Sequence, residues 1–87
     1  MTYQIDFTKL AEDQLAAIPK VDMRKIAKHI EKLSLDPFPV KCEKLSGVDG
    51  DIYRVRQGDY RILYSVFEDT FIVLVVKIGH RKEVYRH

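Results

Sequence analysis

The spacing of apolar and polar residues predicts a strand and two helices in the first half of this chain. Residues 3–7 alternate Tyr, Ile and Phe with polar residues, which is typical of a short half-buried strand. Apolar residues then recur every three or four positions along two successive segments, as they do on the buried face of a helix. Thr8 is the expected N-cap of the first helix, and Pro19 is expected to end it. Asp22 is the expected N-cap of the second helix, which should end at Asp36 because a proline follows.

The second half of the chain predicts three more strands. Residues 53–57 and 60–67 alternate around a two-residue Gly58-Asp turn, and a glycine first in such a turn favours type II′ geometry. Residues 71–78 form a nearly continuous β-branched run, which is typical of a central strand covered on both faces. The segment 40–51 between the second helix and these strands is expected to be a loop.

The expected order is therefore β-α-α-β-β-β, an α+β fold in which a helical hairpin packs on one face of a mostly antiparallel sheet. The 87 residues predict a single domain over 1–87, and 46% hydrophobic with 32% charged residues is a globular composition. Cys42 is the single cysteine, so neither an intrachain disulfide nor a cysteine-based zinc site is expected. Because the N-terminus lacks a hydrophobic signal segment and no apolar run approaches bilayer length, a cytoplasmic protein without a membrane partner is expected.

Three arginines of the hairpin are the strongest functional signal in the sequence. The two-residue turn pairs Arg56 with Arg61 and Arg54 with Leu63, and the alternation of a strand then puts all three arginines on one face. Like charges directly opposite each other destabilise a sheet, and the arginine fork suits phosphate. A phosphate-binding face is the leading hypothesis. The alternative is a solvated face whose arginines form ion pairs with Asp59 or Glu83.

The chain resembles the RelE branch of the RelE/ParE toxin superfamily. The resemblance rests on D-P followed by K-L-S-G, then YRVRQGDYRILY, a hydrophobic strand and IGHRKEVY, and it covers nearly the whole sequence. It implies a microbial-RNase-like fold and a toxin of a type II toxin–antitoxin pair. Toxins of this branch enter the A site of the 30S ribosomal subunit and cut the mRNA there, and a RelB-like antitoxin neutralises them.

The resemblance also assigns roles to residues of this chain. The implied catalytic residues are Arg54, Arg56, Arg61, Arg81 and Tyr85. The implied RNA-binding residues are Arg54, Arg56, Lys82 and Arg86. No metal and no cofactor is implied. Relatives carry Lys where this chain has Arg54 and Arg56.

Arginine is protonated at neutral pH and makes a poor general base. The arginines are therefore expected to position the RNA and to stabilise the charge of the transition state. His80 is a tentative proton donor, since the ordinary pKa of histidine suits proton transfer. Tyr85 is expected to stack on a base or to hydrogen-bond near the 2′-OH.

Two other functions compete with the nuclease. One is a ParE-like toxin that binds and inhibits DNA gyrase without cutting RNA, which shares the fold and the hairpin. The other is a non-toxic binding module of the same fold. The combination of basic residues with Tyr85 favours the nuclease.

Overall fold

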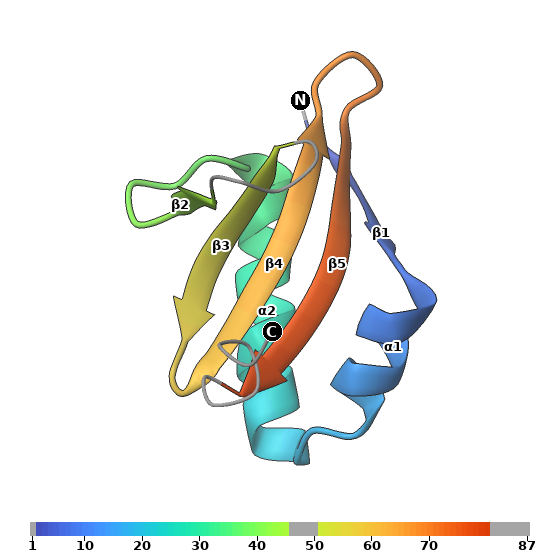
Figure 1. Cartoon of the computed structure of the whole chain (residues 1–87), viewed down its shortest axis with the longest axis vertical. Coiled ribbons are helices and arrows are strands. Elements are labelled where there is room, and N and C mark those ends of the chain that lie inside the picture. Colours follow the sequence, from blue (N-terminus) through green and yellow to red (C-terminus); the bar gives the residue numbers. More distant parts are fainter. Residues whose placement is uncertain (1, 46–50, 81–87) are drawn as a thin grey trace.

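A computed structural model describes residues 2–45 and 51–80 and shows two helices beside one sheet (Figure 1). The elements, in chain order, are β1 (Gln4–Phe7), α1 (Lys9–Ala16), α2 (Lys20–Leu35), β2 (Glu43–Leu45), β3 (Ile52–Gln57), β4 (Tyr60–Phe67) and β5 (Ile72–His80). This confirms the α+β class and the helical hairpin between the first strand and the others.

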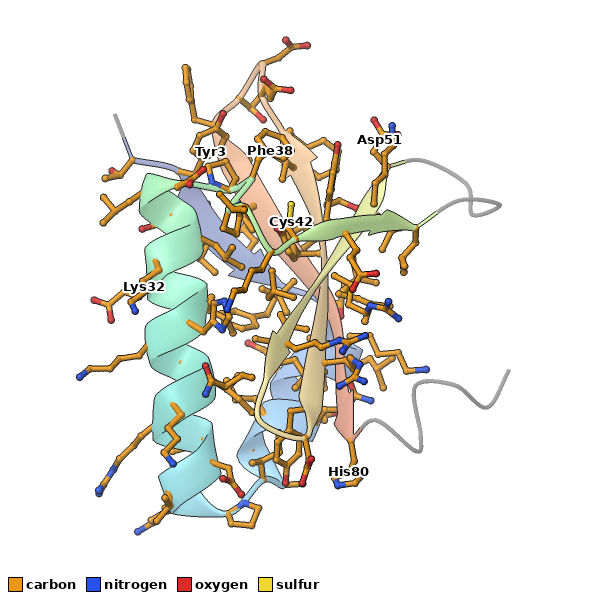
Figure 2. All side chains as sticks on the ribbon, turned by 90° about the vertical axis from the view of Figure 1, so that its left-hand side faces the viewer. Tyr3, Lys32, Phe38, Cys42, Asp51 and His80 are labelled. Atoms are coloured by element: carbon orange, nitrogen blue, oxygen red, sulfur yellow. The ribbon has the colours of Figure 1, made fainter. Side chains whose placement is uncertain are left out.

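The described strands form one mixed sheet in the order β1-β5-β4-β3-β2. Strand β1 runs parallel to β5, and the other neighbours are antiparallel. Both helices lie on one side of the sheet, with α2 crossing behind β3 and β4 and α1 beside β1 and β5 (Figures 1 and 2). The opposite face of the sheet carries no helix in the described part of the chain.

The core lies between the helices and the inward side chains of the sheet. Its fully buried members are Ala11, Ile26, Ile30, Leu33, Val55, Ile62, Tyr64, Val73, Val75 and Ile78. Strand β5 was expected to be covered on both faces, and this is wrong for its outward side. Val73 and Val75 are buried, whereas Leu74 between them is only half-buried because neither described helix covers that face.

Two other expectations needed correction. The segment 40–51 is not all loop, since β2 pairs with β3 through Glu43, Lys44 and Leu45. Helix α2 begins at Lys20 with Pro19 at the N-cap position, and Asp22 lies inside its first turn. A proline there leaves no side chain to cap the helix, but its fixed φ suits the entry into a helix.

The hairpin matches its sequence prediction in register and in turn. Arg56 pairs with Arg61 and Arg54 with Leu63. Gly58 has a φ of 60°, and Asp59 is not among the described residues with positive φ. This is the pattern of a type II′ turn, which fixes the register and therefore the face on which the arginines lie.

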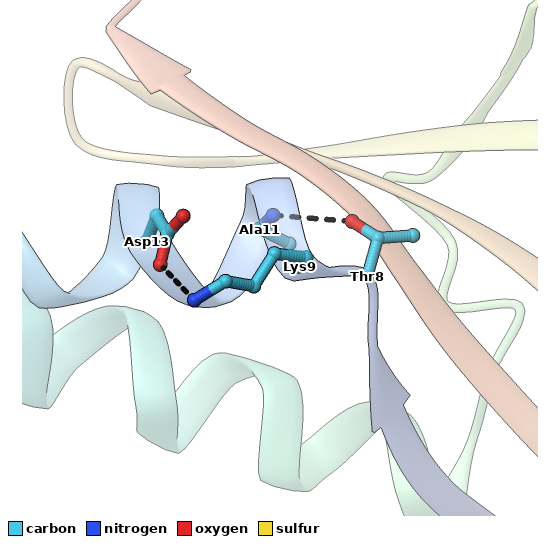
Figure 3. A network of polar contacts seen from close by, with 4 residues as sticks. All are labelled: Thr8, Lys9, Ala11 and Asp13. Atoms are coloured by element: carbon cyan, nitrogen blue, oxygen red, sulfur yellow. Dashed lines mark hydrogen bonds and ion pairs between the residues drawn. The ribbon is translucent and has the colours of Figure 1, made fainter.

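Thr8 is the N-cap of helix α1, as predicted, and it also joins the helix to the sheet. The Thr8 hydroxyl accepts a hydrogen bond from the Ala11 N–H at 3.1 Å and donates one to the Val76 carbonyl at 2.8 Å. Figure 3 shows the cap beside the ion pair of Lys9 and Asp13, whose side chains are both largely exposed. The cap joins the helix to β5, whereas the ion pair stays on the helix surface.

Replacing Thr8 by Ala is expected to lower the free energy of unfolding by about 1–2 kcal/mol, because the helix loses its cap and β5 loses a hydrogen-bond donor. Replacing Lys9 by Ala is the matched control and should cost about 0.5 kcal/mol or less, as exposed ion pairs do. Urea denaturation of both variants measures the difference. Equal losses in the two variants would contradict the role given to the cap.

Tyr64 is the largest fully buried side chain of the core. Its hydroxyl donates a hydrogen bond to the Pro37 carbonyl at 2.8 Å, and its ring stacks on Tyr53 with centroids 5.9 Å apart. Burial, and to a lesser extent the nearby Cys42, raises the pKa of this phenol well above its ordinary value. The folded protein therefore holds Tyr64 neutral at a pH where the unfolded chain ionises it.

Stability should therefore fall as the pH rises above about 10, the ordinary pKa of tyrosine. Tyr64→Phe removes this contribution, so its free energy of unfolding should fall less steeply than that of the wild type, by up to about 1.4 kcal/mol per pH unit. At neutral pH the same variant should be less stable by about 1–3 kcal/mol, because the Pro37 carbonyl loses its buried donor. Denaturation from pH 8 to 11 tests both statements, and parallel curves for the two proteins would refute the first.

Candidate functional site

The arginine face consists of Arg54, Arg56 and Arg61 on the side of the sheet opposite α1 and α2. Their neighbours in the strands, Val55 and Ile62, point to the helices and are buried, so the alternation of β3 and β4 directs all three arginines outward. The three side chains differ in exposure. Arg61 is 5% exposed, the Arg54 side chain 12% and the Arg56 side chain 57%. Two of the cations are thus held in the sheet surface, and Arg56 reaches into solvent.

Glu43 supplies a carboxylate that contacts this face. One of its oxygens lies 3.0 Å from the Arg54 Nη2 atom, and the other lies 3.8 Å from the Arg56 Nη2 atom. The contact follows from the pairing of β2 with β3, which puts Glu43 opposite Arg54. Sequence reasoning missed this residue because a three-residue strand is too short to give a periodic signal. The ion pairs that it had considered were with Asp59 and Glu83.

A hollow of about 430 Å³ runs along the edge of β3 between α2 and the segment leading into β2. Its polar lining includes His29, Lys41, Glu43 and Arg56. His29, one of its lining residues, contacts the Gln57 side chain, with Nδ1 and Oε1 3.0 Å apart. The hollow therefore connects the edge of the arginine face with the side of α2.

A second hollow of about 270 Å³ adjoins the first through His29 and is lined by three lysines of α2. These are Lys25, Lys28 and Lys32. Figure 2 shows Lys32 pointing away from the sheet. Cations thus extend from the arginine face around the edge of β3 to the exposed side of the helix.

The structure places His80 on the opposite face of the sheet from Arg54, Arg56 and Arg61. His80 pairs with Tyr60 in the β4–β5 register, and their rings meet edge to face at 5.6 Å. Arg61 is the next residue after Tyr60 and points to the opposite face, and His80 lines a hollow with Gln14 and Ile18 of the helical layer. The proton-donor role considered for His80 therefore has no support in its position.

The remaining predicted site residues lie outside the described residues. They are Arg81, Lys82, Tyr85 and Arg86. Their roles stay predictions. Strand β5 ends at His80, directly before them, and β5 is the neighbour of β4 on the side away from β3.

The described geometry defines a class of protein: a two-layer α+β domain whose open sheet face holds a fixed group of guanidinium groups. Arginine forks within a sheet surface are suited to bind an anion with several oxygens, such as a phosphate group. Their positions are set by the register of the hairpin, so the site is organised before any ligand arrives.

Comparison with known proteins gives the family. Residues 5–85 match the model of the ParE toxin of the type II toxin–antitoxin system parDE. The chain is 30% identical over 90 residues to a putative toxin RelE1 of Methanocaldococcus jannaschii, with 100% of this chain and 99% of the relative covered. It is 27% identical over 89 residues to the mRNA interferase toxin RelE of Escherichia coli, with 98% and 92% covered. The chain therefore belongs to the ParE toxin family, within the RelE/ParE superfamily, and is a toxin of a type II toxin–antitoxin system.

Solved structures agree with this assignment. The archaeal RelE–RelB complex from Pyrococcus horikoshii contains a chain that is 31% identical, with a TM-score of 0.81 and 100% of both chains covered. An E. coli RelE mutant in the free state has a TM-score of 0.79 at 24% identity, which shows the shared fold. Within the described residues, no helix is long and apolar enough to cross a membrane.

Proposed function

We propose that this toxin is a ribosome-dependent endoribonuclease that cleaves mRNA in the A site without a metal ion. The arginine face is the observation that carries the proposal, because it offers guanidinium groups at fixed positions to a phosphodiester. The mRNA interferase name of the E. coli relative supports cleavage of RNA as the reaction.

The reaction would begin with attack of a 2′-OH on the adjacent phosphorus. The 2′ proton would pass to solvent water, the phosphorane that forms carries extra negative charge, and the 5′-oxygen would leave with a proton taken from water. Arg54, Arg56 and Arg61 would stabilise the phosphorane, which is the contribution that divalent metal ions make in other nucleases. These cations cannot remove the 2′ proton at neutral pH.

Orientation of the RNA by the ribosome would supply much of the remaining rate enhancement. A ribosome that holds the mRNA codon against the arginine face would convert a slow encounter into a reaction of correctly placed groups. Arg81 and Tyr85 are proposed to complete the site, with Arg81 on the phosphate and Tyr85 beside the attacked nucleotide. Lys82 and Arg86 would bind the RNA backbone nearby.

A RelB-like antitoxin is the proposed protein partner. The relatives from P. horikoshii and M. jannaschii were solved as complexes with RelB. An antitoxin segment that covers the arginine face would prevent access to the ribosome. Co-expression with the antitoxin should then restore growth.

The chemistry is tested with purified toxin, programmed ribosomes and an mRNA carrying one 2′-deoxynucleotide at the mapped cut. The proposal expects cleavage of the all-ribose mRNA, none at the deoxy position, and none of either RNA without ribosomes. Cleavage at the deoxy position would rule out attack by the 2′-OH. Cleavage of free RNA at the same sites would rule out dependence on the ribosome.

Inhibition of DNA gyrase is the second candidate function. The match to the ParE family model favours it, because ParE-type toxins act on gyrase. In cells, this function would cause growth arrest while the mRNA stays intact. With purified proteins, the toxin would inhibit supercoiling by gyrase.

A further inference from the structure

The arginine face contacts a carboxylate of the protein itself, that of Glu43. Glu43 reaches Arg54 at 3.0 Å and Arg56 at 3.8 Å, one carboxylate oxygen to each guanidinium. A carboxylate presents two oxygens to arginine forks in the way that a phosphate presents two of its oxygens. Glu43 therefore occupies positions that the phosphate of a substrate would need.

We infer that Glu43 is an internal competitor for RNA phosphate at Arg54 and Arg56. The inference rests on the proposed function, in which these two arginines bind the RNA. In the resting protein the carboxylate offsets the repulsion among the arginines of the hairpin, where Arg56 lies directly opposite Arg61. Binding of a phosphate requires Glu43 to turn away.

The surroundings of Glu43 make such a movement possible. Its side chain is 52% exposed and sits on a three-residue strand at the edge of the sheet. The hollow beside it is also lined by Lys41, so the displaced carboxylate has another cationic partner within the same cavity. Arg54, by contrast, is held at 12% side-chain exposure and stays in place.

The chain offers a matched control in a neighbouring ion pair. Asp51 lies 3.2 Å from Lys44, and both side chains are more than half exposed. Glu43→Gln and Asp51→Asn each remove one negative charge from the β2–β3 region, but only the first removes it from the arginines. Any difference between the two variants reports the local contact rather than the net charge.

The experiment measures binding of a fluorescent single-stranded RNA 12-mer with 2′-O-methyl groups, which cannot be cut by internal attack. Glu43→Gln should bind it about three- to fivefold more tightly than the wild type, the effect of one partly exposed ion pair. Asp51→Asn should bind with wild-type affinity, and Glu43→Asp should be close to the wild type. Unchanged or weaker binding by Glu43→Gln overturns the inference, and so does equal tightening by Asp51→Asn.

A kinetic readout separates competition from a role in the chemistry. With programmed ribosomes, Glu43→Gln should lower KM while kcat stays within about twofold, since only ground-state binding changes. A large fall in kcat would make Glu43 a proton-transfer group and overturn its role as a competitor. The 12-mer assay involves neither ribosomes nor cleavage. Its binding result can therefore be interpreted even if the nuclease proposal fails.

Discussion

Replacing Arg56 by Ala is expected to reduce cleavage of ribosome-bound mRNA by about a hundredfold to a thousandfold, the effect of removing one donor that stabilises a transition-state charge. Arg56 is the exposed member of the arginine face, with 57% side-chain exposure, and its contact with Glu43 is long at 3.8 Å. Its removal should therefore change the free energy of unfolding by less than about 0.5 kcal/mol. Most of the loss should appear in kcat, because the added charge on the phosphorus exists only in the transition state.

Lys44→Ala is the matched control for this variant. Lys44 belongs to β2, is 60% exposed and pairs with Asp51, so its removal takes away one nearby cation without touching the arginine face. Its cleavage rate should stay within about threefold of the wild type, as expected for a screened surface charge. Similar losses in the Lys44 and Arg56 variants would show that general attraction of RNA, and not local stabilisation, explains the rate.

Replacing Arg61 by Lys is expected to lower cleavage by about tenfold to a hundredfold, although the charge is kept. Arg61 is 5% exposed on the central strand, opposite Arg56, so its guanidinium has little freedom to move. Lysine offers a single ammonium where arginine offers a planar fork, and the loss of one charged hydrogen bond costs about 1.5–3 kcal/mol. Rates measured with saturating ribosomes, together with a thermal unfolding curve, distinguish this loss from unfolding.

Arg54→Lys is the companion variant and should be milder, because the resemblance to the RelE branch implies that lysine works at this position. Its ammonium also remains within reach of Glu43. Equal tolerance of lysine at 54 and 61 would mean that charge alone matters at the arginine face. Complete inactivity of Arg61→Lys with a lowered melting temperature would instead assign Arg61 a structural role.

The arginine face was predictable from sequence because its geometry depends on local rules. A two-residue turn with Gly58 fixes the register, and a strand period of two then fixes the face of each side chain. The same reasoning identified Thr8 as a helix cap. In both cases the residues that decide the structure lie within a few positions of one another.

The features that the sequence did not predict depend on contacts between segments far apart in the chain. Glu43 contacts Arg54 because β2 pairs with the edge of β3. The residues around Glu43 carry no sequence pattern that predicts this pairing. His80 belongs to the helical layer because the register of β5 shifts opposite Leu63 and Tyr64, an irregularity that no local pattern encodes. The partial exposure of Leu74 likewise reflects the absence of a helix on one face of the sheet in the described part of the chain.

Primer extension on a reporter mRNA, in cells that express the toxin without an antitoxin, tests the central claim most directly. The account predicts cuts within codons of the translated frame, which disappear when the start codon is removed and when Arg56 is replaced by Ala. Growth arrest with an intact reporter mRNA would contradict it and would move the assignment to gyrase. Cuts that persist without a start codon would contradict the dependence on the ribosome.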